Sequence, residues 1–93
     1  MSITRINEFQ AAEGKADELF YFLKTLMEYI LSSEGCESCE VLQSCENIAS
    51  FVVIEKWTSE IFHKQSLEKY PKEKMAEAMP LIGLPPKGAF YHV

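Results

Sequence analysis

The segment from Lys15 to Ser33 constrains the fold more than any other part of the chain. Its apolar residues recur at spacings of three and four positions, which predicts an amphipathic helix with one apolar stripe. The stripe is formed by Ala16, Leu19, Phe20, Leu23, Leu26, Met27 and Ile30. Such a stripe must pack against another apolar surface, and a chain of 93 residues has to supply that surface within one domain.

Four segments have the alternation or the apolar runs of β-strands and can supply this surface. They comprise residues 2–10, 36–45, 51–57 and 88–93. The third is almost continuously apolar and is predicted to be buried on both faces. Residues 46–50 have the length of a hairpin connection between the second and third strands.

A second helical region follows the third strand. A helix is predicted from Glu60 to about Leu67, and Tyr70-Pro71 interrupts it because proline disfavours helical backbone in the residue before it. A further helical piece is predicted from Pro71 to about Met79, since proline suits a first helical turn. Residues 80–87 are rich in proline and glycine and are predicted to form a loop.

The resulting order of elements is strand–helix–strand–strand–helix–strand. This order is the ferredoxin-like βαββαβ arrangement, an α+β fold with a four-stranded antiparallel sheet, and residues 1–93 are predicted to form it as a single domain. The helices cover one face of such a sheet, whereas the second and third strands carry apolar residues toward both faces. We therefore expect a homodimer in which two sheets pack face to face.

Composition excludes several partners. The formal net charge of −5 argues against nucleic-acid binding, which needs a basic surface. No apolar run approaches the roughly 18 residues of a membrane-spanning helix. The start of the chain, Met1–Arg5, lacks the charged end and apolar centre of a signal peptide. We expect a cytoplasmic protein that binds neither nucleic acid nor membrane.

Three cysteines, Cys36, Cys39 and Cys45, lie close together. An odd number so closely spaced is a poor disulfide framework. Cys36 and Cys39 have C-x-x-C spacing, but positions three apart on a regular strand point to opposite faces. His63 and His92 do not have the spacing of zinc-finger ligands. The cysteines are therefore predicted to be small buried apolar residues, and no metal site is expected.

Several short motifs have a familiar arrangement. They are the turn Gly14-Lys15, the stretch Glu34-Gly35-Cys36-Glu37-Ser38 followed by Val41-Leu42-Gln43-Ser44, and the strand Phe51–Trp57 that ends just before a helix. Together they resemble the antibiotic biosynthesis monooxygenase family, over essentially the whole chain. The resemblance implies a dimeric α+β barrel with a pocket between the sheet and the helices of each subunit. Members of this group include cofactor-free oxygenases of polycyclic phenols and quinols, related dimers that degrade haem, and proteins that isomerise or bind small carbonyl compounds.

The resemblance also implies functional residues. Asn7 falls where oxygenases of this group often place an asparagine that binds substrate or oxygen, although it could equally be a strand residue bonded to a neighbour. Trp57 matches a strand-end tryptophan, which can also be pure packing. Many members carry a histidine about nine residues after that tryptophan, whereas this chain has Ser66 there. His63 lies one turn earlier and becomes the candidate base.

The expected function is that of a cofactor-independent monooxygenase or quinol oxidase acting on a small aromatic or polycyclic phenol. Such an enzyme needs an apolar pocket, an oxyanion donor such as Asn7 and a base. Glu55 is an alternative base if it is buried, because burial raises the pKa of a carboxyl group. The pocket is predicted to be lined by Phe9, Phe20, Phe51, Trp57 and Phe62.

Two other readings follow from the residues. Because Ser66 replaces the usual histidine, the chain could be a non-catalytic dimer that binds a small molecule, as in a stress response. Haem-degrading relatives need an axial histidine in the later helical region, but the matching stretch Met75–Ala78 contains no ligand. No cofactor is therefore expected.

Overall fold

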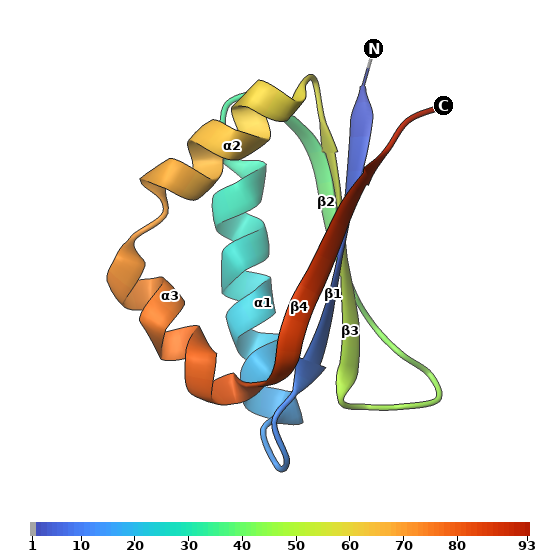
Figure 1. The fold of residues 1–93 in the computed structure, drawn as a ribbon, viewed down its shortest axis with the longest axis vertical. Coiled ribbons are helices and arrows are strands. Elements are labelled where there is room, and N and C mark those ends of the chain that lie inside the picture. Colours follow the sequence, from blue (N-terminus) through green and yellow to red (C-terminus); the bar gives the residue numbers. More distant parts are fainter. Residues whose placement is uncertain (1) are drawn as a thin grey trace.

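A computed structural model describes residues 2–93, and it contains a four-stranded antiparallel sheet with the strand order β2-β3-β1-β4 (Figure 1). The strands are β1 (Ile3–Ala11), β2 (Cys36–Gln43), β3 (Ser50–Trp57) and β4 (Ile82–Tyr91). Their order along the chain and in the sheet is that of the ferredoxin-like fold, so the predicted fold class is confirmed.

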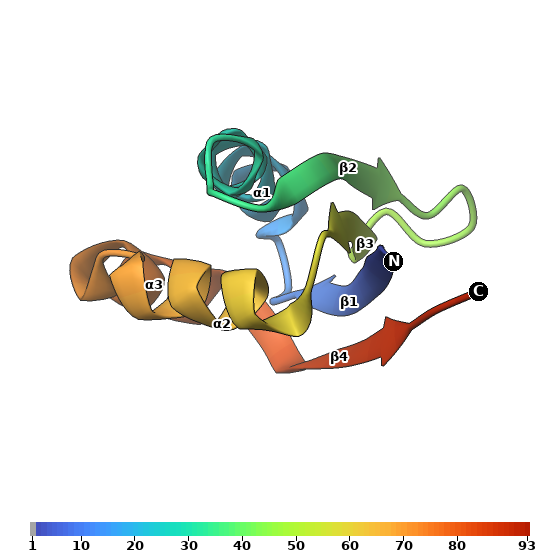
Figure 2. The ribbon, with the colours of Figure 1, turned by 90° about the horizontal axis from the view of Figure 1, so that it is seen from above.

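The helices all lie on one side of this sheet, as Figure 2 shows. They are α1 (Ala16–Leu31), α2 (Glu60–Lys69) and α3 (Lys72–Ala78), and a short 3-10 turn, η1 (Met79–Leu81), leads into β4. The bounds lie within two residues of the predicted ones, because proline and glycine mark the ends. No helix in the described residues combines the length and apolar character that a membrane span requires.

The core forms where the apolar stripe of α1 meets the sheet. Its most deeply buried side chains are Leu19, Leu23, Phe51, Val53 and Trp57. On the opposite face of β3, Val52 and Ile54 are only half-buried, because no element within residues 2–93 covers that face. The prediction that this strand is buried on both faces is therefore wrong for the single subunit.

Strand β4 begins earlier than predicted. Residues 82–87 extend the sheet, where the sequence predicted a loop. Between the pairs Glu8–Lys87 and Gln10–Leu84, β1 advances by two residues and β4 by three, so Pro85 and Pro86 lie at a bulge. Proline lacks a backbone N–H and is tolerated in a sheet at an edge strand or a bulge, and β4 provides both.

The cysteines differ from prediction because of a second bulge. Pairing shifts between Cys36, opposite Trp57, and Cys39, opposite Glu55. Trp57 and Glu55 share one face of β3, so the extra residue in β2 places both cysteines on that face as well. Of the three cysteines only Cys39 is buried, Cys36 is half-buried, and Cys45 is exposed beyond the end of β2.

The connection between α1 and β2 contacts α2 closely. Gly35 has a φ of +82°, the left-handed conformation that glycine adopts without strain. A Cβ atom at this position would overlap the ring of Phe62, so α2 packs directly on the glycine backbone. This contact fixes the start of α2 beside the first residue of β2 and the last residue of β3.

Candidate functional site

A row of hydrogen-bonded polar side chains crosses the helix-covered face of β1 and β3. Arg5 Nε donates a hydrogen bond to Asn7 Oδ1 at 2.9 Å. Asn7 Nδ2 in turn donates to Glu55 Oε2 at 2.6 Å, and Trp57 Nε1 donates to Glu55 Oε1 at 2.8 Å. Both oxygens of the buried Glu55 carboxyl group therefore accept a hydrogen bond, which is how a buried acceptor avoids a large desolvation cost.

His63 of α2 lies against this carboxyl group. Its Nε2 atom is 4.0 Å from Glu55 Oε1, and the ring is buried. The imidazole meets the rings of Trp57 and Phe90 edge-on, with centroid distances of 5.6 Å and 5.1 Å. The guanidinium of Arg5 lies over the Phe90 ring, 4.8 Å from its centroid. The aromatic neighbours hold the imidazole in one orientation beside the carboxyl group.

A cavity of about 130 Å³ lies between these groups and the helices. The sheet contributes mainly polar side chains to its wall, and the helices contribute mainly apolar ones together with His63 and Ser66 of α2. The lining residues are Arg5, Asn7, Phe9, Leu26, Tyr29, Ile30, Glu55, His63, Ser66, Leu67, Tyr70 and Met75. An apolar protein cavity of about 150 Å³ can bind benzene, so the space suits one aromatic ring.

Burial shifts both titratable groups toward their neutral forms. The pKa of Glu55 is raised by desolvation, while the hydrogen bond from Trp57, the charge of Arg5 and the hydrogen bond from Asn7 oppose this shift. The pKa of His63 is lowered by desolvation and by the positive charge of Arg5. A neutral His63 can accept a proton, and the resulting imidazolium would lie next to the Glu55 carboxylate.

A sequence model of the antibiotic biosynthesis monooxygenase family matches residues 2–74. The chain belongs to this family. No curated protein sequence matches it significantly. The predicted family is thereby confirmed, and proteins with the fold of this family typically form dimers.

Solved structures of similar proteins support the same fold. SnoaB, a cofactor-independent oxygenase from Streptomyces nogalater, aligns with a TM-score of 0.85 at 15% identity, covering 99% of this chain and 92% of SnoaB. A conserved protein from Methanosarcina mazei aligns with a TM-score of 0.87 at 24% identity, covering 99% and 92%. PA3566 from Pseudomonas aeruginosa aligns with a TM-score of 0.88 at 19% identity, covering 99% and 93%.

Four of the candidate residues that the sequence singled out lie together in this family member. Asn7, Phe9, Glu55 and His63 all line the 130 Å³ cavity. Asn7 does not point its amide freely into the cavity, because its oxygen accepts from Arg5 and its nitrogen donates to Glu55. Its position therefore depends on the carboxyl group as much as on the strand.

The other four aromatic candidates lie outside the cavity lining. Phe20 and Phe51 stack on each other in the core, with ring centroids 5.4 Å apart. Trp57 is fully buried and reaches the site only through Glu55 and the His63 ring. Phe62 packs on the connection after α1. The sequence shows that these residues are apolar, but it does not distinguish a core wall from a pocket wall.

Several site residues were missed by the sequence analysis. Arg5 shares the strand face of Asn7, so the alternation of β1 could have indicated it. Tyr29 and Tyr70 also line the cavity, and their rings meet edge-on at 4.8 Å. Phe90 comes from β4 at the end of the chain, and nothing in the local sequence indicates that it reaches His63.

The remaining candidates have other environments. Ser66, at the position of the usual family histidine, is buried and its hydroxyl donates to the backbone oxygen of His63 at 2.8 Å. Burial and the charge of Glu55 raise the pKa of the Cys39 thiol to about 12. Within residues 2–93, no group of three or more histidine, cysteine or acidic side chains could hold a metal ion.

Proposed function

We propose that this protein is a cofactor-independent monooxygenase or quinol oxidase that oxidises a phenol or quinol with molecular oxygen in the cavity beside His63. The observation that carries the proposal is the buried pair of His63 and Glu55, which faces a space the size of one aromatic ring. Membership of the antibiotic biosynthesis monooxygenase family supports the reaction class, because SnoaB of the same fold is a cofactor-independent oxygenase.

The residues support removal of a proton from the bound ring. The neutral imidazole of His63 accepts the proton of the substrate hydroxyl, and the Glu55 carboxylate stabilises the imidazolium that forms. Arg5 lines the same cavity and places a positive charge near the developing phenolate. For a quinol, the phenolate then passes two electrons to oxygen, and the proton held on His63 together with the proton of the second hydroxyl completes hydrogen peroxide and leaves the quinone.

Oxygen uptake tests this proposal. Purified protein is mixed with a panel of single-ring hydroquinones and with two-ring and three-ring phenols, and oxygen consumption and peroxide are followed with an electrode and a coupled dye. We expect turnover above the rate of autoxidation for single-ring substrates, because the cavity has room for one ring. Rates equal to autoxidation across the whole panel would refute the proposal.

The pH profile should report the titration of His63. As the pH falls through the lowered pKa of His63, the imidazole becomes protonated and can no longer accept a proton, so kcat/KM should fall on the acid side, below pH 6.5. The contribution of His63 to the free energy of unfolding should also fall as the pH falls, because the unfolded chain, in which the histidine has its ordinary pKa, binds more protons than the folded chain in this range.

The His63→Gln variant should lose this acid limb and about 10²-fold in kcat/KM. His92→Gln is the matched control, because His92 is exposed and bonds only the neighbouring Val93 backbone. A wild-type acid limb that persists unchanged in His63→Gln would assign the titration to another group.

A second candidate function is a small-molecule-binding dimer without catalytic activity. Ser66 favours it, because the hydroxyl at the usual histidine position is bonded within its own helix and is not free to act on a ligand. Tight binding of phenols together with the absence of oxygen uptake above autoxidation would support this function over the first.

We further propose that two copies of the chain pack through the uncovered face of the sheet. This face carries an apolar group on adjacent strands, consisting of Ile6, Leu42, Val52, Ile54 and Tyr91. Leu42 and Tyr91 are 46% and 54% exposed in the single subunit, so a partner sheet would bury apolar surface that now meets water.

Light scattering tests the dimer. We expect a mass of twice 10.6 kDa at micromolar concentration for the wild type. Ile54→Lys places a charge at the centre of the face, where a partner sheet would take it out of water, and should give a monomer of 10.6 kDa. Ile61→Lys is the control, because Ile61 is exposed on α2 and lies on the helical side. A monomeric wild type would contradict the proposal.

A further inference from the structure

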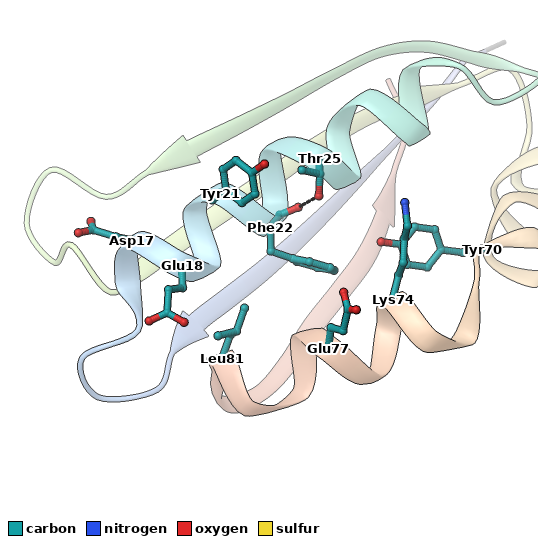
Figure 3. Close-up of a pocket in the computed structure, with 9 residues that line it drawn as sticks. All are labelled: Asp17, Glu18, Tyr21, Phe22, Thr25, Tyr70, Lys74, Glu77 and Leu81. Atoms are coloured by element: carbon teal, nitrogen blue, oxygen red, sulfur yellow. Dashed lines mark hydrogen bonds between the residues drawn. The ribbon is translucent and has the colours of Figure 1, made fainter.

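A second, larger hollow lies between α1 and the region of α3. It has a volume of about 590 Å³ and opens on the surface of the helical layer (Figure 3). We call it the outer groove; its lining residues are Asp17, Glu18, Tyr21, Phe22, Thr25, Tyr70, Lys74, Glu77 and Leu81. Figure 3 shows Phe22 of α1 and Leu81 of η1 reaching into the gap, and the Glu77 carboxylate of α3 pointing into it as well. Most of the surface that lines the outer groove is nevertheless apolar.

The outer groove adjoins the cavity beside His63. Along α1, Phe22 and Thr25 line the outer groove, and the next turn, with Leu26 and Tyr29, lines the cavity. Tyr70 lines both spaces and is the wall that they share. A ligand that occupies both spaces would pass beside Tyr70, whose side chain has to turn aside to join them.

Tyr70 is positioned by aromatic contact at the end of α2. Its ring meets the Tyr29 ring edge-on at 4.8 Å, and Tyr29 Oη donates to the Ser66 backbone oxygen at 2.7 Å. Its backbone is extended, with φ of −68° and ψ of 132°, because Pro71 follows and ends the helix there. The Tyr70 side chain therefore lies at the break between α2 and α3, where it is buried, with 8% of its surface exposed.

The charges around the outer groove decide which ligands suit it. The lining holds three carboxylates, Asp17, Glu18 and Glu77, and one ammonium, Lys74, and Lys15 pairs with Glu18 from outside the lining at 3.4 Å. This excess of negative charge disfavours an acidic substituent such as a carboxylate or phosphate. The apolar floor gives no partner to a polar chain, since a buried polar group without a hydrogen bond is costly. An uncharged hydrocarbon chain fits both conditions.

We propose that the outer groove binds an alkyl or isoprenyl substituent of a single-ring phenol or quinol whose ring occupies the cavity beside His63. This rests on the proposed function for the identity of the ring. The sizes of the two spaces match the two parts of such a ligand. The cavity of about 130 Å³ has room for one ring, and the outer groove of about 590 Å³ has room for a chain of several carbons. The substrate class is an alkyl-substituted phenol or quinol.

Calorimetric titration with phenol, 4-ethylphenol, 4-butylphenol and 4-hexylphenol tests the inference without requiring turnover. Each methylene buried in the outer groove should tighten binding about threefold to fourfold. We therefore expect 4-butylphenol to bind at least about 30-fold more tightly than phenol. Equal Kd values for phenol and the alkylphenols would overturn the inference.

The variant Thr25→Trp places a large side chain in the outer groove from the exposed face of α1. It should abolish the gain in affinity with chain length and leave the Kd of phenol unchanged. Glu28→Trp is the matched control, an exposed position on the same helix that does not line the outer groove, and should behave as wild type. If Thr25→Trp does not fold, Glu77→Trp fills the same space from α3.

The outcomes separate this inference from the proposed function. A gain in affinity with chain length that survives in both filling variants would show non-specific binding and overturn the inference. Chain-length dependence that disappears in Thr25→Trp, without any oxygen uptake, would support the outer groove and refute the oxygenase. Turnover of single-ring hydroquinones with Kd values independent of chain length would support the proposed function and refute the binding of a hydrocarbon chain in the outer groove.

Discussion

Replacing Glu55 by glutamine should lower kcat/KM for quinol oxidation by about 10²-fold. Arg5 Nε donates to Asn7 Oδ1, so the amide nitrogen of Asn7 must point toward Glu55. The indole of Trp57 presents a second donor to the same side chain. A carboxylate accepts both, whereas glutamine has one oxygen and would leave one buried donor without an acceptor.

The charge change acts on the same step. The carboxylate lies 4.0 Å from His63 Nε2 and stabilises the imidazolium that forms when the substrate loses its proton. In Glu55→Gln this charge is absent. Burial and the charge of Arg5 still lower the pKa of His63, and no carboxylate remains to stabilise the imidazolium, so His63 accepts the substrate proton less readily. The loss should therefore appear in kcat more than in KM, because phenol binding in the ground state does not need the charge.

Glu28→Gln is the control for Glu55→Gln. It removes the same charge from an exposed position on α1, away from the cavity. Steady-state oxygen uptake measures activity, and circular dichroism verifies that both variants are folded. A folded Glu55→Gln protein with wild-type kcat/KM would show that the carboxyl group has no part in the reaction.

The second large effect concerns stability. Gly35→Ala should lower the free energy of unfolding by about 2–5 kcal/mol, as the sum of two costs. The first is the left-handed backbone at φ +82°, which costs an L-residue about 1–2 kcal/mol. The second is the overlap of the new Cβ with the Phe62 ring, which has to move together with the start of α2.

Gly14 separates the two costs. It has a similar φ of +75°, but a Cβ atom there would meet no atom within 4 Å. Gly14→Ala should therefore lose only the backbone part, about 1–2 kcal/mol. Urea unfolding at one fixed protein concentration measures both variants, because dimerisation would make stability depend on concentration. Equal losses in the two variants would show that the Phe62 contact contributes nothing.

Much of the fold follows from local sequence. Three patterns predicted elements that the structure contains: the three- and four-residue spacing at residues 15–33, the alternation at residues 2–10 and the apolar run at residues 51–57. The one misplaced element is β4, which begins at Ile82 although Pro85 and Pro86 indicate a loop. Those prolines are tolerated because β4 lies at the sheet edge and bulges there, and strand order is not encoded locally.

The candidate site follows from the sequence only in part. Asn7 and His63 were identified by residue type and family resemblance, and both line the cavity. Glu55 was identified only as an alternative base, and Arg5 was not identified, because a hydrogen bond across β1 and β3 depends on strand register, which places Arg5 opposite Glu55. Phe90 joins the site from a strand that ends the chain, through pairing with Arg5 on β1.

The sequence by itself determined the type and order of the elements, because backbone hydrogen bonding and apolar periodicity act over a few residues. It also determined the family and the short list of side chains able to move a proton. The tertiary structure alone decided which aromatic residues form core and which form cavity. It also decided that Glu55, with two fixed donors, faces His63, because those contacts join residues far apart in sequence and depend on register, bulges and helix position.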